Sequence, residues 1–178
     1  AYYIKYPSYD TIMAIYGNVI SFESVINANI IGLDASHNTI LQNLNCSNNN
    51  LTSLDVSSCT ALTNLDCSNN NLDTLDVSGC TALTDLDCSN NNLTTLDVIT
   101  CTSLGNLTCH NNQLTSLNTN DCSLLYALSC YGNKFSTNGY DSLMCLFTDY
   151  SGTGTDNTFY PLYDANDTNS ATFLAANA

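Results

Sequence analysis

Apolar residues recur along the middle of the chain with a fixed period of 21 residues. Residues 62–82 read L-T-N-L-D-C-S-N-N-N-L-D-T-L-D-V-S-G-C-T-A, and the neighbouring segments repeat this pattern almost unchanged. A period of this size is typical of solenoid proteins, in which each repeat forms one coil that contacts only its neighbours. The pattern therefore predicts a stack of coils over residues 33–135.

Within one repeat, apolar and polar residues alternate in two short stretches. The stretches L-D-C at residues 65–67 and L-D-V at residues 75–77 have the period of two that indicates a half-buried strand. No stretch of the repeat shows the 3.6-residue period of a helix. We therefore predict an all-β-rich solenoid with short parallel strands on two sides of each coil. The predicted inward residues of this coil are Leu62, Leu65, Cys67, Asn70, Leu72, Leu75, Val77 and Cys80.

Two segments without the regular pattern flank the repeats. Residues 1–32 are predicted to be an N-terminal cap and a degenerate first coil, with a short helix from Ser8 to Tyr16. In that coil Ile20 is expected to point inward, and Glu23 replaces a repeat leucine. Residues 136–178 lose the period, and we predict an α/β C-terminal cap of a helix, a strand and the start of a second helix.

Most of the ten cysteines fall into two ladders with the period of the repeats. Disulfides between equivalent positions on parallel strands would strain the bridge geometry. Zinc sites use closely paired cysteines, whereas the shortest spacing here is eight residues. Because each ladder position requires a small inward apolar side chain, we predict packed free thiols. One ladder is Cys46, Cys67, Cys88, Cys109 and Cys130; the other is Cys59, Cys80, Cys101 and Cys122; Cys145 belongs to neither.

Asparagines form a third ladder at the turn after the first strand. Backbone N–H and C=O groups lose their strand partners where the chain bends inward, and a buried amide can bond to them and to the next amide of the stack. We therefore predict a structural role for this ladder. Asparagines on both sides of the first three members suit a tight turn, because Asn tolerates the left-handed conformation; they are Asn48, Asn50, Asn69, Asn71, Asn90 and Asn92. The ladder consists of Asn49, Asn70, Asn91, Asn112 and Asn133.

The charge of the chain is sparse and one-sided. It has 16 acidic residues against two lysines, and its formal net charge is −14. Nucleic acids and anionic membranes are bound through Lys and Arg, and an apolar run of membrane-spanning length does not occur. We therefore expect neither nucleic-acid binding nor membrane insertion. We also expect no cofactor.

An acidic ladder is predicted on the second strand. Stacked carboxylates repel one another, and two arrangements relieve the repulsion. In the first, each carboxylate is solvated and accepts bonds from nearby turn N–H groups. In the second, a cation such as Ca²⁺ bridges adjacent coils. The ladder consists of Asp34, Asp55, Asp76 and Asp97.

The predicted outward positions of the first strand carry mostly small polar or acidic residues, for example Asn64, Asp66 and Ser68. Binding faces usually carry aromatic anchors, so we place a candidate recognition spot at His110, Tyr126 and Tyr131; alternatively, these are surface residues near a cap. A second aromatic cluster lies near the N-terminus, and we expect it either to cap the first coil or to dock on another subunit. It consists of Tyr2, Tyr3, Tyr6 and Tyr9. The two histidines lie far apart in the chain, so no Ser-His-Asp arrangement can be argued, and the paired aspartates lie on a repeated face. We therefore expect no enzyme.

The motif L-x-x-L-x-C-x-x-N-x-L-x-x-L-D-V-x-x-C of residues 33–135 resembles the bacterial leucine-rich repeats of the irregular 21-residue class, called IRREKO repeats. The resemblance implies a secreted or surface-attached, non-enzymatic scaffold that binds a protein or a surface glycan in interaction or adhesion. The residues leave two alternatives. The chain assembles with copies of itself into an extracellular filament or tube through its aromatic ends, or rows such as Thr60, Thr81 and Thr102 bind glycan or ice.

Overall fold

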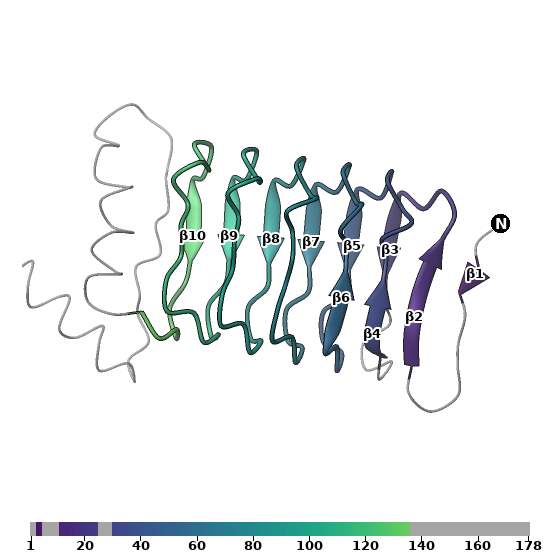
Figure 1. The fold of residues 1–178 in the computed structure, drawn as a ribbon, viewed down its shortest axis with the longest axis horizontal. Helices are drawn as coiled ribbons and strands as arrows, with labels where there is room; N and C mark the ends of the chain where they lie inside the picture. The colour runs from purple at the N-terminus through teal and green to yellow at the C-terminus, as the bar shows by residue number, and fades with distance from the viewer. Residues whose placement is uncertain (1–2, 5–10, 25–29, 136–178) are drawn as a thin grey trace, which may run out of the picture.

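The computed structural model describes residues 3–4, 11–24 and 30–135. In these residues the chain winds into a β-solenoid whose coils stack along one long axis (Figure 1), and no described residue is helical. The predicted solenoid is therefore confirmed. The predicted C-terminal cap, residues 136–178, lies outside the described residues.

The longer of the two sheets is parallel and has six strands in the order β10-β9-β8-β7-β5-β3. Its register pairs equivalent residues of successive repeats, for example Leu44 with Leu65 and Leu65 with Leu86. The sequence period is therefore the length of one coil. The strands are β3 (Ser21–Glu23), β5 (Asn43–Asn45), β7 (Asn64–Asp66), β8 (Asp85–Asp87), β9 (Asn106–Thr108) and β10 (Ala127–Ser129).

The second sheet covers only the first coils, in the order β1-β2-β4-β6. The strands are β1 (Tyr3–Ile4), β2 (Thr11–Tyr16), β4 (Ile30–Asp34) and β6 (Ser53–Asp55); β1 is antiparallel to β2 and the others are parallel.

The strand expected at residues 75–77 is not formed, and farther along this side only an isolated bridge joins Asp97 to Asn118. Single backbone bonds join the later coils here, such as Asn92 N–H to Leu72 C=O at 2.9 Å. Because each extended segment is so short, the loss of one backbone hydrogen bond between coils is enough to prevent a regular pair of strands.

The predicted helix from Ser8 to Tyr16 is wrong where the structure describes it, because Thr11–Tyr16 is strand β2. Met13 and Ile15 are buried, whereas Ile12 and Tyr16 are exposed. This alternation has the period of a strand, and β2 pairs with β4. Pairing with a neighbouring strand therefore outweighs the local cap signal around Ser8.

The first coil is one residue longer than the later ones. Phe22 pairs with Leu44, and Glu23 pairs with Asn45, so the offset here is 22 residues. Glu23 consequently takes an outward position and does not replace a repeat leucine, as the 21-residue alignment had predicted. Ile20, which we expected to point inward, is 55% exposed. The extra residue shifts its side chain from the inner face to the outer face.

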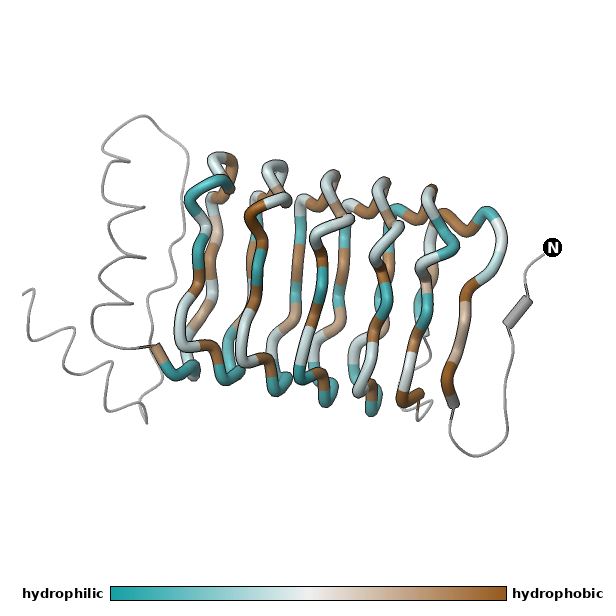
Figure 2. Tube along the Cα trace, viewed as in Figure 1, coloured by the Kyte–Doolittle hydropathy of each residue, from teal (hydrophilic) through white to brown (hydrophobic). Residues whose placement is uncertain are grey.

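The core is one continuous column of leucine, valine and cysteine side chains. All the inward residues predicted for the coil at 62–82 are buried, and hydrophobic residues recur at the same place in successive coils (Figure 2). Nine cysteines of the described residues are buried free thiols, as predicted. In the second ladder the thiols reach the preceding coil, with Cys59 Sγ 3.3 Å from the Ala35 carbonyl oxygen and Cys122 Sγ 3.5 Å from that of Val98.

The buried asparagines join each coil to the previous one. Asn70 Nδ2 donates to the carbonyl oxygens of Cys46 at 3.0 Å and Cys67 at 3.1 Å, while Asn70 Oδ1 accepts the N–H of Leu51 at 2.9 Å. Asn91 and Asn112 repeat these bonds. The amide therefore bonds to backbone and not, as expected, to the next amide of the stack.

The turn beside each buried asparagine requires a left-handed residue. Asn48, Asn69, Asn90 and Asn111 have φ values between 54° and 56°, and Gly132 takes the same place in the last coil with φ 62°. Asn and Gly adopt this conformation at low cost. The turn therefore sets the direction in which the chain leaves strands β5, β7, β8, β9 and β10.

Candidate functional site

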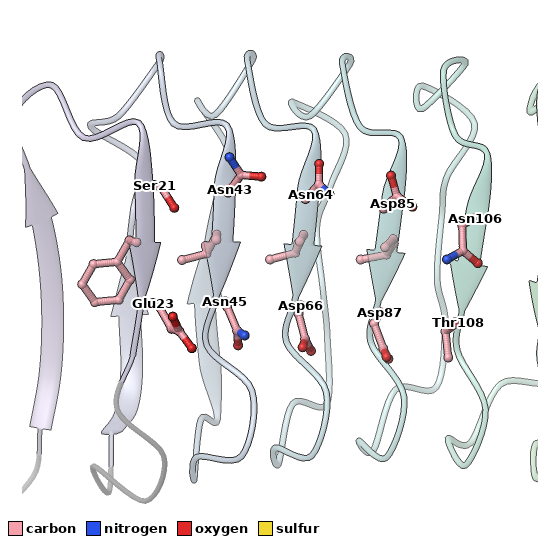
Figure 3. Close-up of a pocket in the computed structure, with 14 residues that line it drawn as sticks. Ser21, Glu23, Asn43, Asn45, Asn64, Asp66, Asp85, Asp87, Asn106 and Thr108 are labelled. Atoms are coloured by element: carbon pink, nitrogen blue, oxygen red, sulfur yellow. The ribbon is translucent and has the colours of Figure 1, made fainter.

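An open groove of about 380 Å³ runs across the outward face of the six-stranded sheet. Strands β3, β5, β7, β8 and β9 each contribute the two polar residues that flank the central residue of the strand (Figure 3). Because the register is constant, these side chains form two rows. One row is Ser21, Asn43, Asn64, Asp85 and Asn106, and the other is Glu23, Asn45, Asp66, Asp87 and Thr108.

The groove carries negative charge without a balancing cation. Its ionisable side chains are Glu23, Asp66, Asp85 and Asp87. The one lysine in the described part of the chain is Lys134, whose Nζ donates to Gln113 Oε1 at 2.9 Å. The groove carboxylates therefore face solvent without ion-pair partners among the described residues.

Serine side chains hold two of these carboxylates in place. Asp66 Oδ1 accepts the backbone N–H of Ser68 at 3.0 Å and its hydroxyl at 2.7 Å. Asp87 Oδ1 accepts the same two groups of Ser89 at 2.9 and 2.6 Å. The second oxygen of each carboxylate has no hydrogen-bond partner among the described residues, so each is positioned and still able to bind.

The serines themselves do not lie where we expected. Ser68 was predicted to point outward, but Ser47, Ser68 and Ser89 are buried. Each hydroxyl turns toward the side chain two residues earlier, which for Ser47 is the Oδ1 of Asn45 at 2.8 Å. Burial of the serine therefore positions the outward carboxylate or amide.

The candidate spot of His110, Tyr126 and Tyr131 is only partly brought together. The rings of His110 and Tyr131 stack with centroids 4.3 Å apart and an interplanar angle of 9°. Burial lowers the pKa of His110, although the nearby Asp87 carboxylate acts in the opposite direction. The burial therefore favours the neutral form of His110, and the stacked pair lies outside the residues that line the groove.

Tyr126 does not join this pair. It precedes strand β10, whereas Tyr131 follows that strand, so the two tyrosines lie toward opposite ends of it. Tyr126 is 52% exposed, and its ring lies over Gly105, where a β-carbon would come within 2.7 Å of the ring. Of the N-terminal tyrosines, Tyr3 belongs to β1, and Tyr2, Tyr6 and Tyr9 lie outside the described residues.

The acidic ladder lies away from the groove, on the other side of the coils. Asp34, Asp55, Asp76 and Asp97 each accept the backbone N–H of the residue two positions later at 2.9–3.0 Å. Bonds from Ser57 lower the pKa of Asp55, and bonds from Ser78 lower that of Asp76. No described group of three or more His, Cys, Asp or Glu side chains is arranged to hold a metal ion.

The groove is the part of this surface that the sequence did not predict. A signal for it was present, because Asn or Asp flanks the central leucine of β5, β7 and β8. Aromatic residues occur mainly toward the ends of the sequence, whereas the shape of the groove depends on how the coils stack. Within the described residues no helix is long and apolar enough to cross a membrane.

Comparison with known proteins identifies the repeats. The family model described as "Leucine Rich repeats (2 copies)" matches residues 41–79. Residues 41–79 therefore match leucine-rich repeats. A search of curated protein sequences gave no match.

Two solved bacterial structures resemble this leucine-rich repeat chain. The functional domain of InlJ from Listeria monocytogenes, which includes a cysteine ladder, is 36% identical with a TM-score of 0.52 over 66% of this chain and 31% of that chain. The internalin inlF of the same species is 20% identical with a TM-score of 0.60 over 72% of this chain and 38% of that one. This chain thus spans about a third of the length of each protein, and the 36% identity to the InlJ domain supports a bacterial origin.

Proposed function

We propose that the chain is a non-enzymatic interaction scaffold that binds another protein through the outward face of its six-stranded sheet. The observation that carries the proposal is the groove across β3, β5, β7, β8 and β9, where two rows of exposed or half-buried polar side chains face outward and no part of the described chain covers them. Leucine-rich repeats form solenoids, and solenoids present extended binding surfaces of this kind.

The groove is built as a rigid surface. The buried asparagines join successive coils, and the buried serines hold Asp66 and Asp87. A surface that is ordered before binding loses less conformational entropy when the partner docks. A surface that is already ordered therefore favours specific recognition of one partner over adaptable binding of many partners.

We further propose that the scaffold works outside the cell, in adhesion at a bacterial surface. The chain has two lysines and no arginine, so trypsin-like proteases find few cleavage sites. The 36% identity to the functional domain of InlJ supports a bacterial scaffold of related construction.

Site-specific photo-crosslinking tests the proposed binding face. A photoreactive amino acid is placed at Asn64, in the groove, or at Thr95, an exposed residue of the opposite side. Each variant is irradiated with extracellular proteins from the bacterium and its surroundings. We expect a discrete crosslinked product from position 64 and none from position 95. Products of equal yield from both positions, or from position 95 alone, would contradict the proposal.

A further inference from the structure

The groove's charge specifies its partner: we propose that the segment bound there is an extended peptide that carries lysine or arginine side chains over β7 and β8. The inference rests on the proposed function, because it assigns the chemistry of the partner at that same surface. Three observations support it: the charge of the groove, the spacing of its carboxylates and the amides beside them.

The negative charge of the groove is complementary to a cationic segment. Glu23, Asp66, Asp85 and Asp87 line the groove, and its remaining polar residues are neutral. A groove lined by one sign of charge concentrates ligands of the opposite sign and raises their association rate. An acidic segment would meet repulsion from every charged residue of this face.

The spacing suits long cationic side chains. Asp66 and Asp87 are register partners on adjacent strands, a separation of about 4.8 Å. Asp85 and Asp87 lie on the same face of β8, about 7 Å apart along the strand. A guanidinium or ammonium group at the end of a flexible stem can reach two of these carboxylates at once.

A metal ion fits the same residues less well. Ca²⁺ requires six to eight oxygen ligands within about 2.6 Å, which demands side chains that converge on one point. The groove carboxylates belong to no metal-holding group within the described residues. Their separated positions match several side chains of a peptide and do not match a single ion.

Amide side chains beside the carboxylates can bind the peptide backbone. Asn43, Asn64 and Asn106 line the same groove. An amide offers both a donor and an acceptor, which are the two groups that an extended backbone presents. The carboxylates would therefore select the cationic side chains, while the amides hold the main chain between them.

Binding of a fluorescent peptide of alternating arginine and glycine, followed by fluorescence anisotropy, tests the inference. The test variant combines Asp66→Asn, Asp85→Asn and Asp87→Asn, which keep an oxygen that can accept the serine bonds. The control combines Asp55→Asn, Asp76→Asn and Asp97→Asn on the opposite side, which changes the net charge equally. We expect the groove variant to weaken binding by about tenfold or more and the control by less than about twofold.

A second variant keeps the test independent of folding defects. Asn64→Lys adds a cation in the groove and leaves every aspartate in place, and it should also weaken peptide binding. Equal losses in the groove and control variants would overturn the inference, because they would show attraction to net charge alone. Binding of Ca²⁺ alone that the groove variant abolishes, without peptide binding, would also overturn it.

The two proposals fail in different ways. Position 64 could crosslink to a partner whose binding is unaffected by the aspartate substitutions or by added salt. That result would contradict only the proposal that the bound segment is cationic. Absence of crosslinks from position 64 would contradict the binding face itself.

Discussion

At the scale of single residues, the asparagine ladder is the clearest link between sequence and stability. One Asn70 side chain bonds to backbone groups of Cys46, Cys67 and Leu51 and so joins two coils. A leucine or cysteine at this position would fill space but satisfy none of these groups. Buried backbone groups without partners are costly, which explains why the repeat contains a polar residue inside an apolar core.

Substitution of a ladder asparagine should therefore destabilise the fold. We expect Asn70→Ala to lower the free energy of unfolding by about 2–3 kcal/mol, because it leaves buried backbone groups unsatisfied. The matched control is Asn71→Ala, since Asn71 is exposed and should change stability by less than about 0.5 kcal/mol. Urea unfolding followed by circular dichroism measures both, and equal effects would show that the ladder is dispensable.

The buried thiols make stability depend on alkaline pH. Burial raises the pKa of Cys46 and Cys80 to about 12 and that of Cys122 to about 11. An unfolded thiol titrates near pH 8.5, so above that pH the unfolded chain holds fewer protons than the folded chain. Stability is therefore present below about pH 8.5 and lost as pH rises, by about 1.4 kcal/mol per thiol and pH unit.

We expect the protein to unfold between about pH 9 and 11 for this reason, which thermal unfolding across that range would measure. A variant with Cys67→Ala, Cys88→Ala and Cys109→Ala provides the control. It should be less stable at pH 7, because it contains cavities, but its stability should fall less steeply with pH. An unchanged slope would mean that other groups cause the alkaline loss.

At the scale of secondary-structure elements, the sequence of strand β2 (Thr11–Tyr16) and the residues before it is compatible with both a helix and a strand. The residues Pro7 and Ser8 suggested a helix start, whereas the alternation of Met13 and Ile15 with Ile12 and Tyr16 is that of a strand. Pairing with strand β4 is what makes this segment a strand and not a helix. In the regular coils the next repeat shows in the sequence which strand will pair, whereas the first segment has no such repeat.

The orientation of β2 leads to a paired prediction. Ile15 is 5% exposed and Ile12 is 60% exposed, although they lie on the same strand. Ile15→Ala should reduce the free energy of unfolding by about 2–4 kcal/mol through the cavity that it creates, and Ile12→Ala by less than about 1 kcal/mol. Urea unfolding distinguishes them. Similar losses from both would indicate that β2 does not pack with one face on the first coil.

At the scale of the whole molecule, the period was enough to predict the fold, because each coil repeats the same inward pattern. The inward residues of the coil at 62–82 could all be identified from the sequence. The groove could not, since its shape depends on the stacking of five strands and its charge on outward residues that vary between coils. The 22-residue first coil was missed because one inserted residue leaves no mark in composition.

The central claim is that the outward face of the six-stranded sheet binds the partner. Backbone amide NMR of the labelled chain, titrated with the arginine-glycine peptide, tests it most directly. We expect shifts confined to β5 (Asn43–Asn45), β7 (Asn64–Asp66), β8 (Asp85–Asp87) and β9 (Asn106–Thr108). Shifts confined to Asp55, Asp76 and Asp97 on the opposite side, or to the His110 and Tyr131 pair, would contradict it.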